Sequence, residues 1–445
     1  MSDLPMNDAS VNNTSMNDND RHTITRDKVY ASLKRRYRKE KLFRALGLLS
    51  VLFGIACVVV LFTDIFSKGI PAFKQTWIQL DVVLDPEVLG ISSADGNAVQ
   101  GANVDAVLAR ALQTRFPEIS SRVDKKAAKA LLSSSAGDSV LAVLKGNPDK
   151  LGQPVTLWVL ADDRTDTFIK HLRGMNLAEN ERILSDQQTG WIEQWLASGQ
   201  MEQRFNHGFF EFGDSREPEQ AGIRSALAGS ALTLMVTLLL SFPIGVAAAV
   251  YLEEFAPKNR FTDFIEININ NLAAVPSIIY GLLGLAVFIG LFGLPRSVPL
   301  VGGLVLTFMT LPTIIISSRA AIKSVPPSIR EAALGVGASP MQTVTQHVIP
   351  LAMPGMLTGA IIGMARALGE TAPLLMIGMV AFIVDVPHGI TDAATVLPVQ
   401  IFLWADSPER AFVERTSATI MVLLAFLVLM NALAVWLRNK LERRW

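Results

Sequence analysis

The stretch of sequence that decides the fold is SVPPSIREAALGVGASPMQTVTQHVIPLAMPGMLTGAIIGMARALGETAPLLMIGM, residues 324–379. Its first half is polar, and its second half is apolar apart from one arginine and one glutamate. An apolar run of about 20 residues is long enough to cross a bilayer as a helix. We therefore interpret the stretch as a loop at a membrane surface that leads into a membrane helix.

The loop half has the local signals of two short helices separated by a glycine break. The prolines at 326–327 suit a first helical turn, where their missing N–H is not needed. We expect a helix over residues 328–334 that ends at Gly335 and Gly337, because glycine is favoured where a helix terminates. Residues 339–342 (SPMQ) have the pattern of a capping box and predict a second helix start.

This loop resembles the EAA loop of ABC importer permeases, in which a coupling helix sits in a cleft of the ATPase subunit. The similarity rests on the EAA run at 331–333, the glycine four residues later and the Ile-Pro pair at 349–350. His347 and Ile349 depart from the usual apolar residue and leucine but leave the helix–glycine–helix pattern intact. An ordinary amphipathic loop helix is the alternative. The resemblance implies coupling to a separate ATPase through Glu331, Ala332, Ala333 and Gly337.

The apolar half carries three glycines spaced four residues apart, Gly355, Gly359 and Gly363. Small residues at this spacing form a stripe on one face of a helix, and such a stripe lets two membrane helices approach closely. We therefore predict that the three glycines pack against a neighbouring helix.

Arg366 and Glu370 are the two charged residues of the apolar half, and their spacing puts them on one helix face. If the helix begins near Pro354, Arg366 lies about 18 Å along it, near the middle of the bilayer. Charges there are costly and normally pair or face a water-filled cavity. Either the pair only locks helices together, or Arg366 meets a translocated anion while Glu370 orients it or closes the gate. Pro373 predicts a kink beyond them.

Two runs resemble the phosphate-specific permease family of the PstA type, namely ARALGETAPL at 365–374 and NLAAVPSIIYGLLG at 271–284. The resemblance extends from residue 222 to the C-terminus, roughly half of the chain. Permeases for sulfate, molybdate, sugars or amino acids share the EAA loop but are not expected to carry both runs. The resemblance implies phosphate as the substrate and a path or gate formed by Arg366, Glu370 and Thr371.

The composition is that of a membrane protein with a sizeable soluble part, since 50% of the 445 residues are hydrophobic and the mean hydropathy is +0.36. The single cysteine, Cys57, excludes an internal disulfide and a cysteine metal cluster. Uncharged runs predict six membrane spans. These runs are 45–63, 225–252, 267–295, 297–318, part of 354–384, and 416–437.

Basic residues near the ends of these runs orient the chain. Ten Lys or Arg lie between residues 21 and 44, and others follow the second, fourth and last runs. Because positively charged loops stay on the cytoplasmic side, we expect both termini and the loop at about 322–350 in the cytoplasm, with the chain in a bacterial inner membrane. A signal peptide is the alternative for the first run, but that run is long and no small-residue cleavage site follows it.

Residues 67–222 are then expected outside the cytoplasm. Helical patterning at 104–116, 123–132 and within 177–197, with strand-like alternation at 155–160, predicts a mixed α and β domain. This region has 16 Lys or Arg against 21 Asp or Glu, and an acidic surface does not attract anions, so we do not expect phosphate to bind here. Partner docking, gating and a simple spacer remain open as roles.

Polar residues near the second span are interpreted as surface groups. His207 and Asp214 precede the span, within a segment (205–223) expected to form an interfacial helix and an outer-gate contact. Glu253 and Glu254 end the span and are expected in water.

The sequence lacks the motifs of an enzyme. It has no G-x-x-x-x-G-K-[ST] loop to cradle nucleotide phosphates, so we expect no ATP hydrolysis by this chain. It also lacks H-E-x-x-H, a nucleophile elbow and paired Cys/His sets. We expect no catalytic residue, metal or cofactor on this chain, and ATP with Mg²⁺ on the partner ATPase.

Together these features predict an all-α membrane protein with the six-helix type I ABC importer permease fold and a mixed α+β periplasmic domain between helices 1 and 2. The expected parts are a disordered basic tail (1–41), a first membrane helix (42–66), the periplasmic domain (67–222) and the permease core (223–445). The implied partners are a second permease of the PstC type, a dimer of PstB-type ATPases, a periplasmic PstS-type phosphate-binding protein and membrane lipid, without nucleic acid. The alternatives are a permease for another oxyanion, such as molybdate or sulfate, and a membrane sensor or scaffold.

Overall fold

In the computed structural model, residues 18–91, 99, 101–174 and 183–441 are described. They divide into two units, residues 1–64 and 65–445. Of the predicted disordered basic tail (1–41), residues 1–17 lie outside the described residues, and residues 18–41 are helical rather than disordered. The beginning of the helical pattern at 177–197 also lies outside the described residues.

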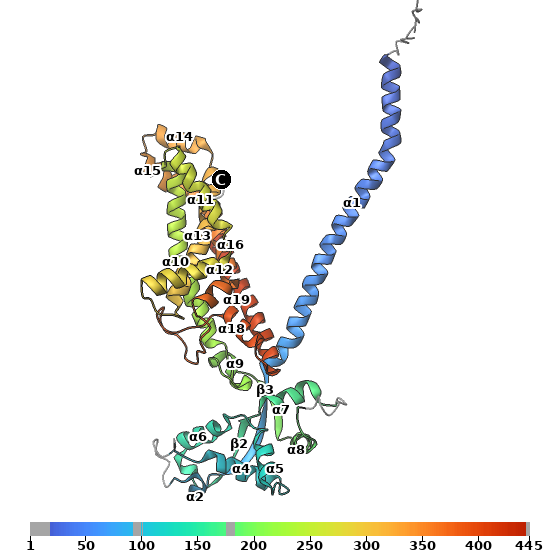
Figure 1. Ribbon diagram of the computed structural model, residues 1–445, viewed down its shortest axis with the longest axis vertical. Coiled ribbons are helices and arrows are strands. Elements are labelled where there is room, and N and C mark those ends of the chain that lie inside the picture. The colour runs from blue at the N-terminus through green and yellow to red at the C-terminus, as the bar shows by residue number, and fades with distance from the viewer. Residues whose placement is uncertain (1–17, 92–98, 100, 175–182, 442–445) are drawn as a thin grey trace, which may run out of the picture. The chain divides into compact units, whose positions relative to one another are not determined.

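One long helix, α1 (Asp18–Gly69), drawn in blue in Figure 1, makes up the described part of the first unit, and its residues 65–69 fall in the second unit. Its part from Arg36 onward is long and apolar enough to cross a membrane. Side chains throughout residues 45–63 are exposed within this unit, and exposed apolar side chains on a helix of this length suit a lipid environment. The helix includes the predicted first span.

The second unit begins with a small α/β lobe, which we define as residues 74–205. Its three-stranded antiparallel sheet has the order β2-β1-β3. The strands are β1 (Lys74–Val83), β2 (Pro154–Leu160) and β3 (Met201–Phe205). The helices are α2 (Pro86–Leu89), α4 (Val104–Arg115), α5 (Arg122–Lys129), α6 (Ala136–Gly146), α7 (Asp163–Thr167) and α8 (Asp186–Ala197).

The lobe has its own apolar core because the central strand alternates. Ile78 and Leu80 of β1 are buried, and Phe116, Trp191 and Trp195 belong to the same buried cluster. The ring centroids of Phe116 and Trp195 lie 4.8 Å apart in an edge-to-face arrangement, which aromatic pairs favour. The lobe therefore combines helices and strands, with a helix at 104–115 and a strand at 154–160 where the sequence pattern predicted them.

The rest of the second unit is helical, and we call residues 223–441 the helical core. Its long helices are α10 (Arg224–Val250), α11 (Arg260–Ala273), α13 (Pro299–Lys323), α16 (Ile349–Gly369) and α19 (Ala411–Leu441). Its short helices are α12 (Ser277–Leu283), α14 (Pro327–Gly335), α15 (Pro340–Thr343), α17 (Ala372–Met376) and α18 (Leu397–Ala405), and α9 (Gly208–Glu211) precedes it.

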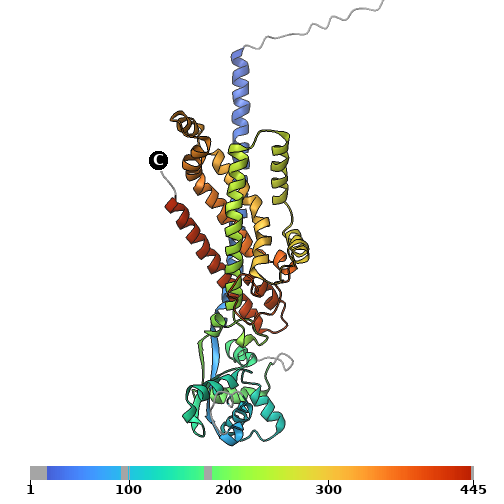
Figure 2. The same cartoon turned by 90° about the vertical axis from the view of Figure 1, so that its left-hand side faces the viewer.

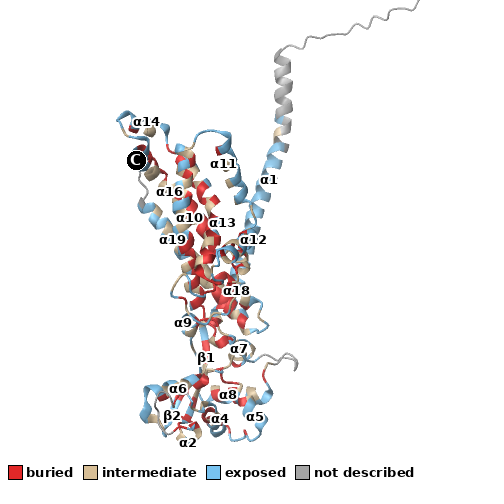
Figure 3. Ribbon diagram, turned by 60° about the vertical axis from the view of Figure 1, so that its left-hand side comes forward, coloured by how far each residue is buried: buried red, intermediate tan, exposed pale blue. Residues whose placement is uncertain are grey.

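Helices α10, α13 and α16 form the packed centre of the helical core. Figure 2 shows α10 running along its length beside α13, and Figure 3 shows buried residues concentrated on these helices. A Cβ on Gly303 of α13 would come within 2.5 Å of Val236 on α10, so this glycine allows the two helices to touch. Thr237 on α10 donates its hydroxyl to the Thr233 carbonyl of its own helix, at 2.8 Å, which satisfies a polar group in an apolar setting.

The expected third span is broken rather than straight. Helix α11 and the helical segment Ser277–Leu291 meet at an angle of 105°, with Pro276 between them. Proline supplies no N–H to continue α11, and the Tyr280 hydroxyl donates to the carbonyl of Leu272 across the bend at 2.7 Å. Among the described residues, five helices can span a membrane by length and composition, and the total reaches six if this bent pair counts as one span.

The fifth span also differs from expectation. Helix α16 ends at Gly369 and does not kink at Pro373. Instead, Pro373 lies in the first turn of α17, where a missing N–H costs nothing. The carbonyl of Thr371 accepts hydrogen bonds from Leu374 and Leu375 at 3.1 and 3.0 Å, so Thr371 starts this new helix. The break places Glu370 and Thr371 between two helices.

The glycine stripe of α16 faces α13. A Cβ on Gly355 would lie 2.6 Å from the Cβ of Ala321, and one on Gly359 would overlap the hydroxyl of Ser317. At Gly363 the nearest side-chain atoms, from Ile314 and Thr310, would lie 3.7 Å away, which is ordinary contact. Close approach between the two helices therefore depends on the first two glycines.

Candidate substrate path and coupling loop

The loop between α13 and α16 folds as two short helices at an elbow. Helix α14 (Pro327–Gly335) has Pro327 in its first turn, and Gly337 follows with a φ of +93°, a left-handed conformation that favours glycine. Ser339 and Gln342 then form a capping box at the start of α15, because each side chain bonds to the backbone of the other residue. The loop is thus a rigid turn built from local signals.

The elbow presents an apolar surface to its surroundings. Glu331 and Ala332 are exposed, while Ala333 is buried. Leu334, Val336 and Met341 are 49%, 87% and 60% exposed. An apolar patch rimmed by polar residues marks a site of protein contact. Sequence reasoning missed these three residues, although their position on either side of the glycine break was visible.

Arg330 anchors the elbow to the helical turn that follows α10, residues 251–255. Its guanidinium contacts Glu254 at 2.6 Å and also donates to the carbonyls of Val325 and Ile322 at 2.8 and 3.0 Å. The Glu254 side chain is 12% exposed. The expectation that Glu253 and Glu254 lie in water is therefore wrong, because the helix that precedes them brings both carboxylates against arginines of the next segments.

A second ion-pair group joins three helices beside this anchor. Arg319 on α13 contacts Glu266 on α11 at 2.5 Å and Glu253, in the helical turn that follows α10, at 3.4 Å. Lys323 approaches Glu253 at 3.5 Å. Planar guanidinium groups can bind two carboxylates at once, so Arg319 holds the ends of three helices together. The elbow is therefore attached to helices that are themselves held together by ion pairs.

Arg366 and Glu370 lie close together at the end of α16. The Nε of Arg366 is 3.4 Å from Oε1 of Glu370, and the two side chains are 47% and 19% exposed. Among the described residues, this is the only hydrogen bond that the guanidinium makes. The long distance and the free terminal nitrogens leave Arg366 able to bind a further anion. The pair is therefore a loose contact at the end of one helix, and it leaves donors of Arg366 unused.

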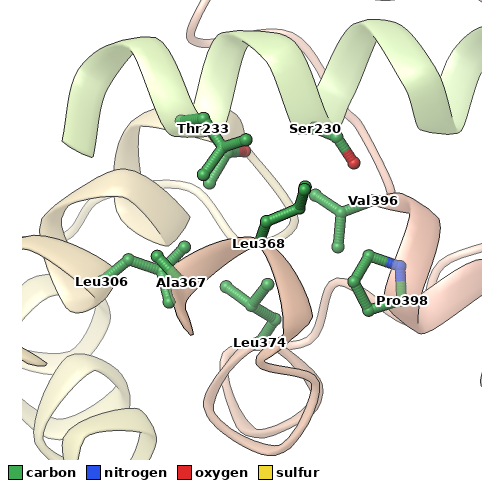
Figure 4. Close-up of a pocket in the computed structure, with 9 residues that line it drawn as sticks. Ser230, Thr233, Leu306, Ala367, Leu368, Leu374, Val396 and Pro398 are labelled. Atoms are coloured by element: carbon green, nitrogen blue, oxygen red, sulfur yellow. The ribbon is translucent and has the colours of Figure 1, made fainter. Parts of the chain in front are cut away.

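A small pocket lies beside the same end of α16, where Ala367 and Leu368 line it (Figure 4). Its lining comes from α10, α13, α16, α17 and α18, and apart from the hydroxyls of Ser230 and Thr233 it is apolar. The Ser230 hydroxyl is already occupied, because it accepts a hydrogen bond from the Leu397 N–H at 2.8 Å. None of the described residues that line the pocket is cationic, so it is unsuited to an inorganic anion. Phosphate would not be expected here.

Asp214 is buried, which corrects the expectation that it lies at the surface. Its Oδ1 accepts a hydrogen bond from the indole N–H of Trp404 on α18, at 2.9 Å, and from the N–H of Ser215. Burial raises the pKa of the Asp214 carboxyl above its usual value. His207, by contrast, is exposed as expected. The aspartate helps to fasten the chain ahead of α10 onto α18.

Asp162 provides a pH-dependent contribution to the stability of the lobe. It caps α7 by accepting the N–H of Arg164 at 3.1 Å, and burial together with the charge of Asp163 raises its pKa to about 7. Because the folded state holds this proton more tightly than the unfolded state, protonated Asp162 contributes to stability. This contribution is fully present below pH 3.8, the usual carboxyl pKa, and is lost as the pH rises through about 7. Asp162→Asn keeps the cap and should abolish this loss.

The measurement is the thermal unfolding midpoint of the purified protein between pH 5 and pH 8. From pH 5 to pH 8, we expect the midpoint of wild type to fall relative to that of Asp162→Asn by roughly 2–4 °C or more. This is the shift that about 1 kcal/mol produces in a domain of 150–250 residues. Asp85→Asn, at the partly exposed cap of α2, is the matched control and should run parallel to wild type. Parallel curves for Asp162→Asn as well would contradict the assignment.

Among the described residues, no group of three or more His, Cys, Asp or Glu side chains could hold a metal ion.

Comparisons with known proteins show which class of membrane protein this chain resembles. Residues 241–445 match the family of binding-protein-dependent transport system inner membrane components, and residues 30–179 match a domain of unknown function, DUF3333. A probable ABC transporter permease protein, YqgI of Bacillus subtilis, is 41% identical over 154 residues, which are 35% of this chain and 52% of that protein. The chain thus spans about half the length of that relative.

The phosphate transport system permease protein PstA 1 of Mycobacterium tuberculosis is 32% identical over 231 residues, which are 51% of this chain and 74% of that protein. An inward-facing structure of the MetNI methionine ABC transporter aligns with a TM-score of 0.42 and 20% identity, over 50% of this chain and 96% of that one.

The helical core with its surface elbow defines a membrane permease subunit of the type I ABC importer fold. Within that class, the chain belongs to the PstA-type family of ABC importer permeases.

Proposed function

We propose that the chain is the membrane permease subunit of an ATP-driven importer of inorganic phosphate. It forms half of the path across the membrane, and it takes its energy from a separate ATPase. The proposal is supported by the similarity to phosphate transport permeases and by the elbow at α14 and α15. The elbow is the observation that carries it, because a rigid, braced loop with an exposed apolar patch is what a coupling element needs.

The elbow couples to the ATPase through two kinds of residue. Leu334, Val336 and Met341 supply apolar area that a cleft in the ATPase would cover. Glu331, Ala332, Ala333 and Gly337 shape the helix and its turn. Arg330 and Glu254 transmit movement of the elbow to α10, since a half-buried guanidinium–carboxylate pair with several hydrogen bonds resists separation.

The substrate path runs past the end of α16. Arg366 meets the phosphate with its free guanidinium nitrogens, Glu370 orients or releases Arg366, and Thr371 lies at the helix break beside them. Selectivity for phosphate belongs mainly to a soluble binding protein, because tight binding of phosphate within the path would slow its release into the cytoplasm.

The chain lies in a bacterial inner membrane with both termini and the elbow in the cytoplasm, and residues 67–222 form a periplasmic domain between the first span and the permease core. This orientation is supported by the basic residues before the first span and near the elbow. The basic tail comprises residues 1–41, the first membrane helix 42–66 and the permease core 223–445.

The assembled importer contains this chain, a second permease of the PstC type, two ATPase subunits of the PstB type that bind ATP and Mg²⁺, and a phosphate-binding protein of the PstS type. Two facing permeases are needed because one anion path requires walls on both sides. Lipid surrounds the complex, and nucleic acid has no role.

The test is uptake of radiolabelled phosphate, at low concentration, in cells that depend on this transporter. We expect uptake that excess sulfate or molybdate does not compete away. If either oxyanion abolished uptake, the chain would belong to a different oxyanion importer. If the cells accumulated no phosphate although the complex assembled, the proposal would be wrong.

The apolar patch of the elbow yields a prediction about assembly. Leu334→Asp should weaken association with the ATPase by about tenfold or more, because a charge would enter the buried centre of an interface. The measurement is the amount of ATPase that co-purifies with the permease in detergent. Val123→Asp, at a 76% exposed position of the lobe, is the matched control and should leave association unchanged. Equal co-purification in both variants would mean that the patch does not touch the ATPase.

A further inference from the structure

Buried charges join the lobe to the start of α19. Lys170, in the helical turn after α7, contacts Asp166 at 2.5 Å and Glu414 of α19 at 3.2 Å. The Lys170 side chain is 6% exposed, and those of Asp166 and Glu414 are 15% and 14% exposed. His171 lies 2.5 Å from the other oxygen of Glu414. A carboxylate at the first turn of α19 is thus fixed by two side chains of the lobe.

The next residue of α19 makes a second connection. Arg415 is buried and donates to the carbonyls of Ala221 and Glu219, both at 3.3 Å. These carbonyls belong to the segment that leads into α10. The Glu219 carbonyl also accepts a hydrogen bond from Gln75 on β1 of the lobe, and its carboxylate accepts the hydroxyl of Ser133 at 2.6 Å. Lobe, α10 segment and α19 therefore share one polar network.

The sheet holds the lobe end of this network in place. Asp166 accepts the backbone N–H and the hydroxyl of Thr76 on β1, at 3.0 and 2.7 Å. Removing one member of a buried ion pair leaves the other uncompensated, which is costly. The contact therefore resists both tilting and sliding of the lobe on α19. A module on a flexible linker would not need buried charges at its attachment.

Helix α19 in turn packs against α16. Leu423, Phe426 and Leu427 of α19 pack against the buried cluster that includes Ala367 and Leu368. These two residues directly follow Arg366 in α16. A chain of packed side chains and ion pairs thus connects the sheet of the lobe to the helix that carries Arg366, and such contiguous networks can carry coupling between distant sites.

We infer that the lobe acts as a rigid lever on α19, and that Lys170 and Glu414 are positioning residues through which it sets the arrangement of α16 during transport. The inference rests on the proposed function. It assigns a mechanical role in the transport cycle to a part of the chain whose family match carries no function. Displacement of the lobe by a partner outside the cytoplasm would reach the substrate path by this route.

The first test compares phosphate uptake and ATPase activity of the assembled importer in proteoliposomes. We expect Lys170→Met and Glu414→Gln each to lower uptake by roughly 2- to 30-fold, the range of coupling along packed networks, while ATP hydrolysis continues. The double variant should be no worse than the worse single one, because both changes break one connection. Lys145→Met, an exposed lysine on the lobe, should match wild type. Wild-type uptake in the two single variants would overturn the inference.

A second measurement does not depend on phosphate transport. Ser133→Cys is placed at the contact with Glu219, in a Cys57→Ser background that removes the natural thiol. A water-soluble maleimide should modify this cysteine slowly when the lobe is seated, and about tenfold faster when Lys170→Met is added, because the contact then opens more often. Lys170→Arg, which keeps the charge, should restore slow modification.

Equal modification rates with and without Lys170→Met would show that the ion pairs do not hold the lobe in place. If wild type moved no phosphate but Lys170→Met still accelerated the modification, the proposed function would be wrong. The conclusion that Lys170 holds the lobe against α19 would remain valid.

Discussion

Arg366→Gln is expected to lower phosphate uptake about 10- to 100-fold while the transporter still assembles. A hydrogen bond that involves a charged partner contributes roughly 1.5–3 kcal/mol, and each 1.4 kcal/mol is a factor of ten. Glutamine keeps an N–H donor on a shorter side chain but removes the positive charge that attracts an anion. The measurement is initial uptake of radiolabelled phosphate, with surface expression and co-purified ATPase determined for each variant. Arg296→Gln, at an exposed loop position, is the matched control and should retain wild-type uptake.

Glu370→Gln and the double variant separate the two roles of the pair. If Arg366 binds phosphate, the double variant remains inactive, because the charge that meets the anion is still missing. If the pair only locks helices, the double variant recovers assembly and uptake, because two neutral amides can replace a loose ion pair at 3.4 Å without leaving an unpaired charge. Recovery would therefore reassign Arg366 and Glu370 to helix packing.

The elbow at α14 and α15 could be predicted closely because its signals are local. Pro327, Gly337 and the Ser339–Gln342 capping box each specify their own backbone conformation, and the structure has the helix starts and stops at those residues. The α/β pattern of the lobe was also visible where alternation or helical spacing was regular, as at β2 and α4.

What the sequence did not reveal depends on residues far apart in the chain. Asp214 is buried because Trp404, 190 residues later, covers it and donates to it. Glu254 is paired because α14 places Arg330 beside the helical turn that follows α10. The break of α16 at Gly369 and the 105° bend at Pro276 were missed for another reason. Hydropathy over an apolar run measures its length in the bilayer, but it does not detect a change of helix direction.

Gly359→Ala is expected to damage the permease core although alanine is the better helix former. In an exposed helix interior, glycine to alanine stabilises by about 1 kcal/mol. Here the new methyl group would overlap the hydroxyl and Cβ of Ser317, so α16 must move away from α13. Forcing extra atoms into a packed core typically costs about 1–3 kcal/mol. The net loss should appear as a lower unfolding midpoint in detergent and as reduced recovery of the assembled complex.

Gly363→Ala, one helical turn along on the same stripe, separates this packing effect from helix propensity. Its methyl group would meet Ile314 and Thr310 at 3.7 Å, an ordinary contact distance, so only the gain in propensity remains and stability should hold or rise. Adding Ser317→Gly to Gly359→Ala removes the clashing side chain and should recover part of the loss. Equal behaviour of the two alanine variants would mean that α16 and α13 do not touch at Gly359. Because the face next to this contact carries Arg366, recovery by Ser317→Gly should restore uptake together with stability.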